Sequence, residues 1–180
     1  MFRIITHNKN KYEEMRKIIP ELEMLDMEYP EIQADTIEEV IDFALDYLGD
    51  KIEGDFIIDD SGLFIHALND FPGVYSAYVF KTIGNEGILR LMENEDKREA
   101  TFKTVIGMCF AGKNFKFVGL CHGEIAREMR GKNGFGYDPI FIPEGYERTF
   151  AEMTTEEKNR ISHRGKALRK VAAFLKRFGP

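Results

Sequence analysis

Residues 99–123 read EATFKTVIGMCFAGKNFKFVGLCHG, a stretch that predicts a long β-hairpin. Two runs rich in β-branched and aromatic residues flank Gly112, the pattern of two strands joined by a tight turn. A two-residue turn at Gly112 and Lys113 gathers the aromatic side chains on one face, whereas a three-residue turn would place Val118 and Leu120 there instead. We prefer the two-residue turn because it unites that face. The face would then carry Phe102, Ile106, Met108, Phe110, Phe115 and Phe117.

Shorter elements flank the hairpin on both sides. Hydrophobic periodicity predicts strands at 2–6 and 22–27, and helices at 11–19, 36–48 and 83–92. The second helix begins with a capping box formed by Thr36 and Glu39. The run that starts at Asp55 predicts a short apolar strand ending at two carboxylates, Asp59 and Asp60. After the hairpin we expect a loop over 130–147 with a brief strand at 140–142, a short helix at 154–159 and a final helix at 162–178.

This order of elements predicts an α/β fold with a mixed sheet that contains a long antiparallel hairpin. The chain has 180 residues, and a length of this order suits one domain spanning 1–180. No low-complexity tract, internal repeat or linker interrupts it. We therefore expect the whole chain to share one architecture.

The charge balance excludes some classes of partner. Asp and Glu number 31 against 25 Lys and Arg, which gives a net charge of −6. That balance argues against a broad nucleic-acid surface, although a small basic pocket for a phosphorylated metabolite remains compatible with it. No apolar run is long enough for a membrane span, and the first residues lack the pattern of a secretory signal. The two cysteines fit a reduced, cytoplasmic protein.

The first candidate for chemistry follows the first strand. Residues 6–11 join a strand to a helix, where free backbone N–H groups and the helix dipole favour anions. Amide and basic side chains at such a junction suit a polyphosphate, and the simpler alternative is a polar loop in which Asn8 or Asn10 caps the helix. The candidate phosphate-binding residues are Thr6, His7, Asn8, Lys9, Asn10 and Lys11.

The second candidate is the acidic pair Asp59 and Asp60. Two adjacent carboxylates beside an apolar strand are costly unless they are solvated, paired or bound to a metal. Mg²⁺ prefers one or two carboxylates together with substrate phosphates. A polar turn and a phosphoacceptor pocket are the alternatives for this segment.

Two further segments complete the set. Residues 131–139 read GKNGFGYDP, whose glycines permit close backbone approach to a ligand and whose Phe135 and Tyr137 can stack on a base. A flexible surface loop is the alternative. Ser162 is expected to cap the last helix, so His163 and Arg164 would oppose its dipole. We expect an anion or polar ligand to compensate them there, unless these side chains simply extend into solvent.

Taken in order, these segments resemble the inosine triphosphate pyrophosphatase family, also called the Ham1-type non-canonical purine nucleoside triphosphate pyrophosphatases. The resemblance covers essentially the whole chain. Two departures are His7, where many members have Gly, and Phe43, where many have Asn. The matching motifs are Thr6, Asn8 and Lys11; Asp59 to Leu63; Pro72, Gly73 and Tyr75 to Ala77; the run from Gly131 to Phe141; Thr155 to Lys158; and Ser162 to Arg164.

The resemblance implies Mg²⁺-dependent hydrolysis of ITP, dITP and XTP to the monophosphate and pyrophosphate. It also implies two lobes around a central cleft, and a homodimer. Asp60 would be the catalytic base and a metal ligand. Glu31 is the best match for a second ligand, with Glu28 and Asp35 close by, and Asp59 is a further candidate. The substrate-binding residues implied beyond residues 6–11 are Ser61, Phe135, Gly136, Tyr137, Asp138, Lys158, His163 and Arg164.

Two other functions remain open from the sequence. One is a Maf-like pyrophosphatase that acts on other modified nucleotides, and the other is a non-catalytic nucleotide-binding protein. The Ser162–Arg164 and Gly134–Asp138 motifs weigh against the first. The intact Asp59, Asp60 and Lys11 weigh against the second.

Overall fold

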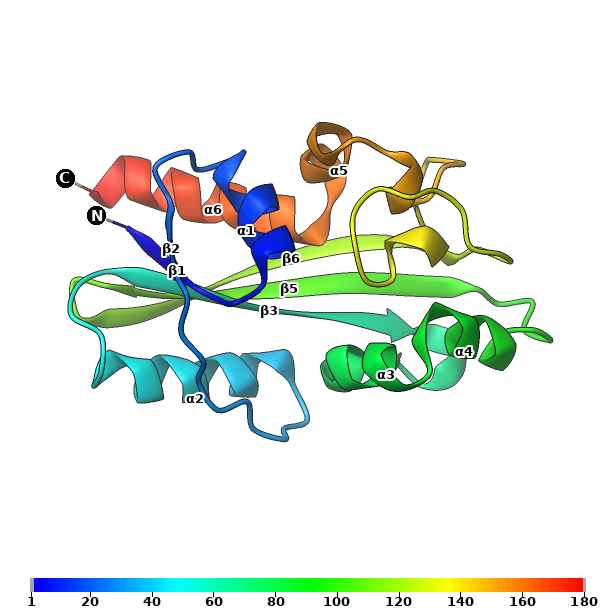
Figure 1. The fold of residues 1–180 in the computed structure, drawn as a ribbon, viewed down its shortest axis with the longest axis horizontal. Helices are drawn as coiled ribbons and strands as arrows, with labels where there is room; N and C mark the ends of the chain where they lie inside the picture. The colour runs from blue at the N-terminus through cyan, green and yellow to red at the C-terminus, as the bar shows by residue number, and fades with distance from the viewer. Residues whose placement is uncertain (1, 180) are drawn as a thin grey trace.

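The computed structural model describes residues 2–179 as a twisted sheet covered by helices on both faces (Figure 1). The strands are β1 Arg3–Ile5, β2 Glu23–Leu25, β3 Phe56–Ile65, β4 Phe71–Pro72, β5 Glu99–Phe110, β6 Lys113–Ile125 and β7 Phe141–Pro143. The helices are α1 Lys9–Arg16, α2 Ile37–Gly49, α3 Ser76–Thr82, α4 Gly84–Leu91, α5 Thr155–Ile161 and α6 His163–Phe178. Short 3₁₀ turns lie at η1 His66–Leu68, η2 Gly73–Tyr75, η3 Asp138–Ile140 and η4 Phe150–Glu152.

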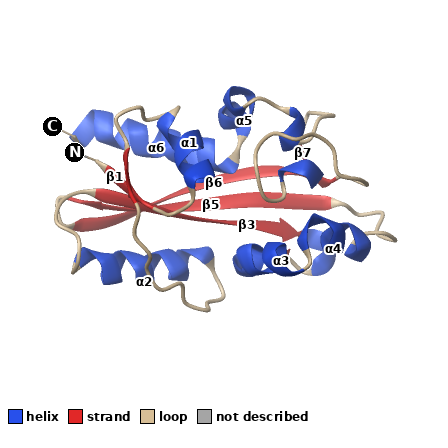
Figure 2. Cartoon of the chain, viewed as in Figure 1, coloured by secondary structure: helices blue, strands red, loops and turns tan. Residues whose placement is uncertain are grey.

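The sheet has the mixed topology that the order of elements predicts. Its strand order is β2-β1-β3-β5-β6-β7, with β4 paired to the far end of β3. β1 runs parallel to both β2 and β3, and all other pairs are antiparallel. Figure 2 shows the long strands β3, β5 and β6 passing through the whole molecule, with α1, α5 and α6 on one side and α2, α3 and α4 on the other. In the part of the chain that the structure describes, no helix has the length and apolarity needed to cross a membrane.

The long strands connect two lobes. One lobe, called the terminal lobe, contains β1, β2, α1, α2 and most of α6. Its hydrophobic core consists of two clusters on opposite faces of the sheet. A distal lobe contains α3, α4, β7 and the 3₁₀ turns, and its core is one cluster that includes Phe141 and Phe150. The expected two-lobed α/β fold is therefore confirmed. Sequence periodicity did not predict α3 or the turns around it.

The hairpin forms with a turn one residue earlier than predicted. Phe110 pairs with Lys113, so the turn is Ala111 and Gly112, and both have positive φ, as a type I′ turn requires. The side chain of Asp55 accepts a hydrogen bond from the Ala111 N–H at 2.8 Å, which stabilises the earlier turn. This register differs from the predicted one by two residues, and an even shift leaves every side chain on its predicted face. The aromatic face therefore forms as expected, beneath α6.

Strand β3 is longer than the sequence indicates, and the prediction that it ends at Asp59 and Asp60 is wrong. The ladder with β5 continues through both carboxylates as far as Ile65, which pairs with Ala100. The strand can continue because Lys11 and Arg164 neutralise Asp59. Within this longer strand, Gly62 permits a close neighbour. A Cβ on Gly62 would lie 2.5 Å from the carbonyl oxygen of Gly73, so only glycine lets η2 approach the strand.

The helix ends agree with the sequence signals where a capping side chain is present. Thr36 and Glu39 form the predicted capping box of α2, and Ser162 caps α6 by accepting from the Gly165 N–H at 3.0 Å. Helix α1 begins earlier than predicted, at Lys9, because Asn8 is its cap. The start of α6 lies against the sheet at Gly119, where a Cβ would come within 1.9 Å of the His163 carbonyl oxygen.

We predict that Gly119→Ala destabilises the protein by at least about 2–3 kcal/mol, because the added methyl group overlaps the backbone of α6 and must push the helix off the sheet. The measurement is urea unfolding followed by circular dichroism. Gly49→Ala is the control, since nothing lies within 4 Å of a Cβ at Gly49, near the end of a helix. Equal midpoints for Gly119→Ala and wild type would show that α6 does not pack this closely.

Candidate functional site

The centre of the site is a buried network of charged side chains from four separate parts of the chain. Arg164, in the first turn of α6, donates from Nε to Asp59 at 3.2 Å and from Nη1 to Glu14 at 2.8 Å. Lys158 of α5 donates to Glu14 at 2.5 Å and to Asp138 at 2.6 Å. All five residues are more than nine-tenths buried. The network joins α1, β3, the loop before β7 and the α5–α6 junction.

The network explains how the last helix tolerates cations at its start. Sequence analysis predicts that an anion or polar ligand compensates His163 and Arg164. For Arg164 the structure supplies that compensation from the protein itself, through Asp59 and Glu14. The side chain of His163 is buried and stacks on Phe102, with ring centroids 4.5 Å apart and planes inclined by 6°. Burial is the main cause that holds the pKa of His163 well below its ordinary value, and the positive charge of the nearby Arg164 lowers it further. The ring is therefore neutral.

Two of the three carboxylates of the network, Glu14 and Asp59, are held ionised although they are buried. Burial alone would raise the pKa of Glu14, but Arg164 and Lys158 outweigh it and hold that pKa below 4.5. In the same way Lys11 and Arg164 overcome the effect of burial on Asp59 and lower its pKa. For Asp138 the effect of burial is larger than the attraction of Lys158, and its pKa is raised. The network is therefore a set of ion pairs held inside the protein before any ligand binds.

The first turn of α1 reaches this network through Lys11, whose Nζ donates to Asp59 at 3.2 Å. The Asn8 side chain caps α1 by accepting from the Lys11 N–H, and the Thr6 hydroxyl accepts from the Asn8 N–H. Thr6 and Asn8 therefore shape the junction that presents Lys11. The other candidates here, His7, Lys9 and Asn10, are exposed, and their side chains make no hydrogen bond within residues 2–179.

A group of carboxylates lies on the other side of β3. Successive residues of a strand point to opposite faces, so Asp60 points away from the Arg164 network that holds Asp59. Burial is the main cause that raises the pKa of Asp60 to about 6; Lys11 opposes the rise, and Asp59 and Glu31 add to it. Tyr29 also lies near these groups, since burial and then Asp59, Glu31 and Asp60 raise the pKa of its hydroxyl.

Asp60 and Glu31 are candidate ligands for a divalent metal ion, and the described residues contain no cluster of three or more His, Cys, Asp or Glu side chains that could hold one without further ligands. The Asp60 side chain accepts one hydrogen bond, from the Ser61 N–H at 2.9 Å, and no cation lies within 4 Å of it in residues 2–179. Carboxylate oxygens held close together with unrelieved repulsion are what a hard cation neutralises. Asp60 and Glu31 thus fit such an ion, whereas Asp59 is already paired with Lys11 and Arg164.

The glycine-rich loop brings an aromatic ring to the network. The Phe135 ring centroid lies 4.9 Å from Lys158 Nζ and 5.6 Å from Arg164 Cζ. The Phe135 N–H donates to Asp138 at 3.0 Å, and Gly134 has a φ of +70°, so the loop turns tightly around that carboxylate. Phe135 remains half-buried, and its ring is available to stack on a planar ligand.

Two other loop residues do not join the network. Tyr137 is buried in the core of the distal lobe, and its hydroxyl donates to the Ser76 carbonyl at 2.7 Å. The Gly136 carbonyl accepts from the Asn85 side chain at 3.0 Å. Both contacts attach the loop to α3 and α4. Their role in the described structure is to position Phe135 and Asp138.

Sequence reasoning missed Glu14, which contacts both basic residues of the network. The signal was present, because Glu14 is three residues after Lys11 and next to the buried Met15, so all three share one face of α1. A carboxylate beside an apolar stripe indicates a buried partner. Tyr29 and Thr104 were also missed, and for these the sequence carries no comparable signal.

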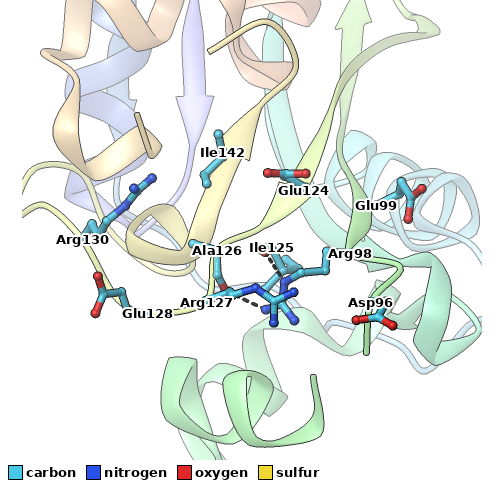
Figure 3. A pocket seen from close by; sticks show the side chains of 10 residues that line it. All are labelled: Asp96, Arg98, Glu99, Glu124, Ile125, Ala126, Arg127, Glu128, Arg130 and Ile142. Atoms are coloured by element: carbon cyan, nitrogen blue, oxygen red, sulfur yellow. Dashed lines mark hydrogen bonds between the residues drawn. The ribbon is translucent and has the colours of Figure 1, made fainter. Parts of the chain in front are cut away.

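Two hollows lie near the lobes. One, of about 520 Å³, lies between the lobes and is bordered by residues 32–35 and Glu39 on one side and Tyr75 on the other, directly after Glu31 in the chain. The second, of about 580 Å³, lies at the end of the distal lobe around Arg98 (Figure 3). Arg98 donates to the backbone carbonyls of Met92, Glu95, Ile125 and Ala126. Its guanidinium is thus used to hold the lobe together, whereas the hollow between the lobes is lined by the residues that directly follow Glu31 in the chain.

Comparisons with known sequences and structures match this chain to one family. A family model described as the Ham1 family matches residues 2–174. The dITP/XTP pyrophosphatase of Thermococcus kodakarensis is 56% identical over 176 residues, covering 96% of this chain and 95% of that protein. That of Pyrococcus horikoshii is 54% identical with the same coverage. The solved structure of a HAM1 protein from Coxiella burnetii has a TM-score of 0.86 at 32% identity, covering 98% of this chain and 100% of its own.

We predict that Glu14→Gln costs about 3–5 kcal/mol of folding free energy, because it leaves Lys158 and Arg164 buried with one carboxylate fewer. The pKa of Glu14 is lower in the folded chain than its ordinary 4.5. Its charge therefore stabilises the fold at pH above 4.5, and this contribution is lost as the pH falls through the folded pKa. Urea unfolding should show a constant gap between wild type and variant near neutral pH that narrows below pH 4.5.

The matched control is Glu13→Gln, which changes an exposed neighbour on the same helix that pairs only with Arg16. It should change stability by less than about 0.5 kcal/mol. A gap for Glu14→Gln as small as that of the control would contradict the buried ion-pair network.

Proposed function

This chain belongs to the Ham1 family, and from that premise we propose that it is a nucleoside triphosphate pyrophosphatase that hydrolyses non-canonical purine nucleotides such as dITP, XTP and ITP. The products are the nucleoside monophosphate and pyrophosphate, which removes these nucleotides from the cellular pool. The observation that supports this most is the arrangement around β3, where Lys11 of α1 pairs with Asp59 and lies close enough to the neighbouring Asp60 to oppose the rise in its pKa. A triphosphate with a divalent cation needs both kinds of group close together.

The proposed reaction is attack of water on the α-phosphorus, with cleavage of the bond between that phosphorus and the oxygen bridging to the β-phosphorus. The Asp60 carboxylate accepts the proton of the attacking water, and its pKa of about 6 suits a general base near neutral pH. Lys11 holds phosphate oxygens of the substrate and of the leaving pyrophosphate. Asp60 and Glu31 would hold Mg²⁺. When bound, this ion would neutralise part of the negative charge of the triphosphate.

Base recognition is proposed for the Arg164 side of the site. The guanidinium has five N–H groups, of which three donate to Asp59, Glu14 and Ser61. One hydrogen on each terminal nitrogen remains, and these two can donate to acceptors on the edge of a 6-oxo purine. Phe135 would stack on the same base. Adenine presents a donor at that position, so its pairing with the guanidinium would be unfavourable.

The proposal extends to assembly and location. The segment 71–83 exposes several large apolar side chains on β4, η2 and α3, a patch of the kind that marks a protein–protein interface. The patch consists of Phe71, Tyr75, Tyr78, Phe80 and Ile83. We propose that it forms a homodimer interface with a second copy of this chain. Both cysteines are free thiols, which fits a cytoplasmic setting.

The function is tested by incubating the purified protein with dITP, XTP, dGTP and dATP in Mg²⁺ and measuring pyrophosphate release. We expect rapid release from dITP and XTP. We predict that Asp60→Asn lowers kcat by at least about 100-fold without lowering Tm, because the amide keeps the shape, removes the proton acceptor and relieves repulsion with Asp59 and Glu31. Turnover within about threefold of wild type in this variant would remove Asp60 from the mechanism.

A second pair of variants separates base recognition from phosphate binding. Arg164→Lys keeps the charge beside Asp59 and Glu14 but loses the planar fork, so the ratio of kcat/KM for dITP over dATP should fall by about 10–100-fold. Lys11→Gln should lower kcat/KM for both nucleotides by the same factor, because phosphates are common to both. If Arg164→Lys lowers the two values equally, Arg164 does not read the base.

The interface is tested by Tyr78→Lys, which places a charge on a side chain that is 70% exposed at the centre of the patch. We predict that wild type sediments as a dimer and that this variant sediments as a monomer, with Tm measured in parallel to confirm folding. Leu120→Lys, at an exposed apolar side chain outside the patch, is the control and should leave the dimer intact. A dimer that persists in Tyr78→Lys places the interface elsewhere.

A further inference from the structure

Two hydroxyl side chains, one on β3 and one on β5, are hydrogen-bonded to each other beside the charge network. Ser61 and Thr104 face each other in the ladder, and their oxygens are 2.6 Å apart. The Ser61 oxygen also lies 3.1 Å from Nη2 of Arg164. Thr104 is completely buried, whereas Ser61 is only partly buried. The proposed reaction assigns no task to Thr104.

The positions of the hydroxyl hydrogens follow from the partners. A guanidinium only donates, so Ser61 accepts from Arg164. If Ser61 also donated to Thr104, the Thr104 hydrogen would need an acceptor, and within residues 2–179 that hydroxyl has no second hydrogen-bond partner. A buried donor left without a partner is unfavourable, and a fully buried side chain has no access to bulk water. Thr104 must therefore donate to Ser61.

This assignment fixes the role of Ser61. Its oxygen accepts from Arg164 on one side and from Thr104 on the other, which occupies both of its lone pairs. The one remaining polar atom is its own hydrogen. Ser61 can then act only as a donor toward the site, on the face of β3 where Asp59 is bonded to Lys11 and Arg164.

We propose that Thr104 is a positioning residue that holds Ser61 as a hydrogen-bond donor to an anionic phosphate oxygen of the bound nucleotide. The inference rests on the proposed function for the identity of the ligand. Thr104 acts through Ser61 and does not touch substrate. Thr104 holds the Ser61 hydroxyl in its binding orientation in advance. An unconstrained hydroxyl would have to be ordered each time the nucleotide binds, which costs binding free energy.

The decisive variant is Thr104→Val, which keeps the shape and the preference for a strand while removing the hydroxyl. We expect kcat/KM for dITP to fall by about 5–30-fold, the effect of a hydrogen bond of ordinary strength. Thr104→Ser, which restores the hydroxyl, should return kcat/KM to within about threefold of wild type. The Tm of each variant, measured alone, reports any change in packing.

A double-mutant cycle identifies the path of the effect. In a Ser61→Ala background, Thr104→Val should cause no further loss, because the group that Thr104 orients is already absent. A loss that persists in that background would overturn the proposal and assign Thr104 to packing. Unchanged kcat/KM in Thr104→Val alone would overturn it as well.

Binding of inorganic pyrophosphate, measured by calorimetry with Mg²⁺, separates this inference from the proposed function. Thr104→Val should weaken that binding by about 5–30-fold, and Thr104→Ser should restore it. If the wild type releases no pyrophosphate from dITP or XTP, the proposed function fails, while the binding comparison still decides the role of Thr104. Equal affinity of wild type and Thr104→Val for pyrophosphate would overturn the positioning role.

Discussion

The structure depends on the neutralisation of charges that are buried together. Arg164 and Lys158 lie inside the protein with Asp59, Glu14 and Asp138, and removing any one of them leaves the buried charges that it contacts with one partner fewer. These residues come from segments that are far apart in the chain, so the network forms only when α1, β3 and the α5–α6 junction are in their native positions. The same contacts therefore build the site and join the elements around it.

The pleat of one strand divides the chemistry of the site. Asp59 and Asp60 are neighbours in sequence, but they point to opposite faces of β3 and meet different surroundings. Lys11 and Arg164 keep the pKa of Asp59 below its ordinary value despite burial. For Asp60, burial and the nearby negative charges of Asp59 and Glu31 act in the other direction and raise its pKa to about 6. One carboxylate is thereby committed to structure, and the other is left available to a metal ion and a proton.

Two glycines let neighbouring backbone segments approach each other closely around the site. Gly62 lets η2 approach β3 immediately after the two carboxylates, and Gly119 lets the first turn of α6 lie on β6. A side chain at either position would separate these elements by the width of a methyl group or more. At Gly119 this separation would move the first turn of α6, and Arg164 with it, away from Asp59. The short polar distances of the site thus follow from backbone contacts elsewhere.

The sequence by itself determined the order of most elements, the capping box of α2 and the aromatic face of the hairpin, and it proposed candidate residues such as Asp59, Lys158 and Arg164, because each is encoded by local periodicity or by a short motif. Tertiary structure decided that β3 continues through Asp59 and Asp60, that Glu14 joins Lys158 to Arg164, and that Thr104 faces Ser61. No local pattern contains these outcomes. Each depends on a neutralising or hydrogen-bonding partner that is distant in the chain and comes within reach only when the sheet and helices pack together.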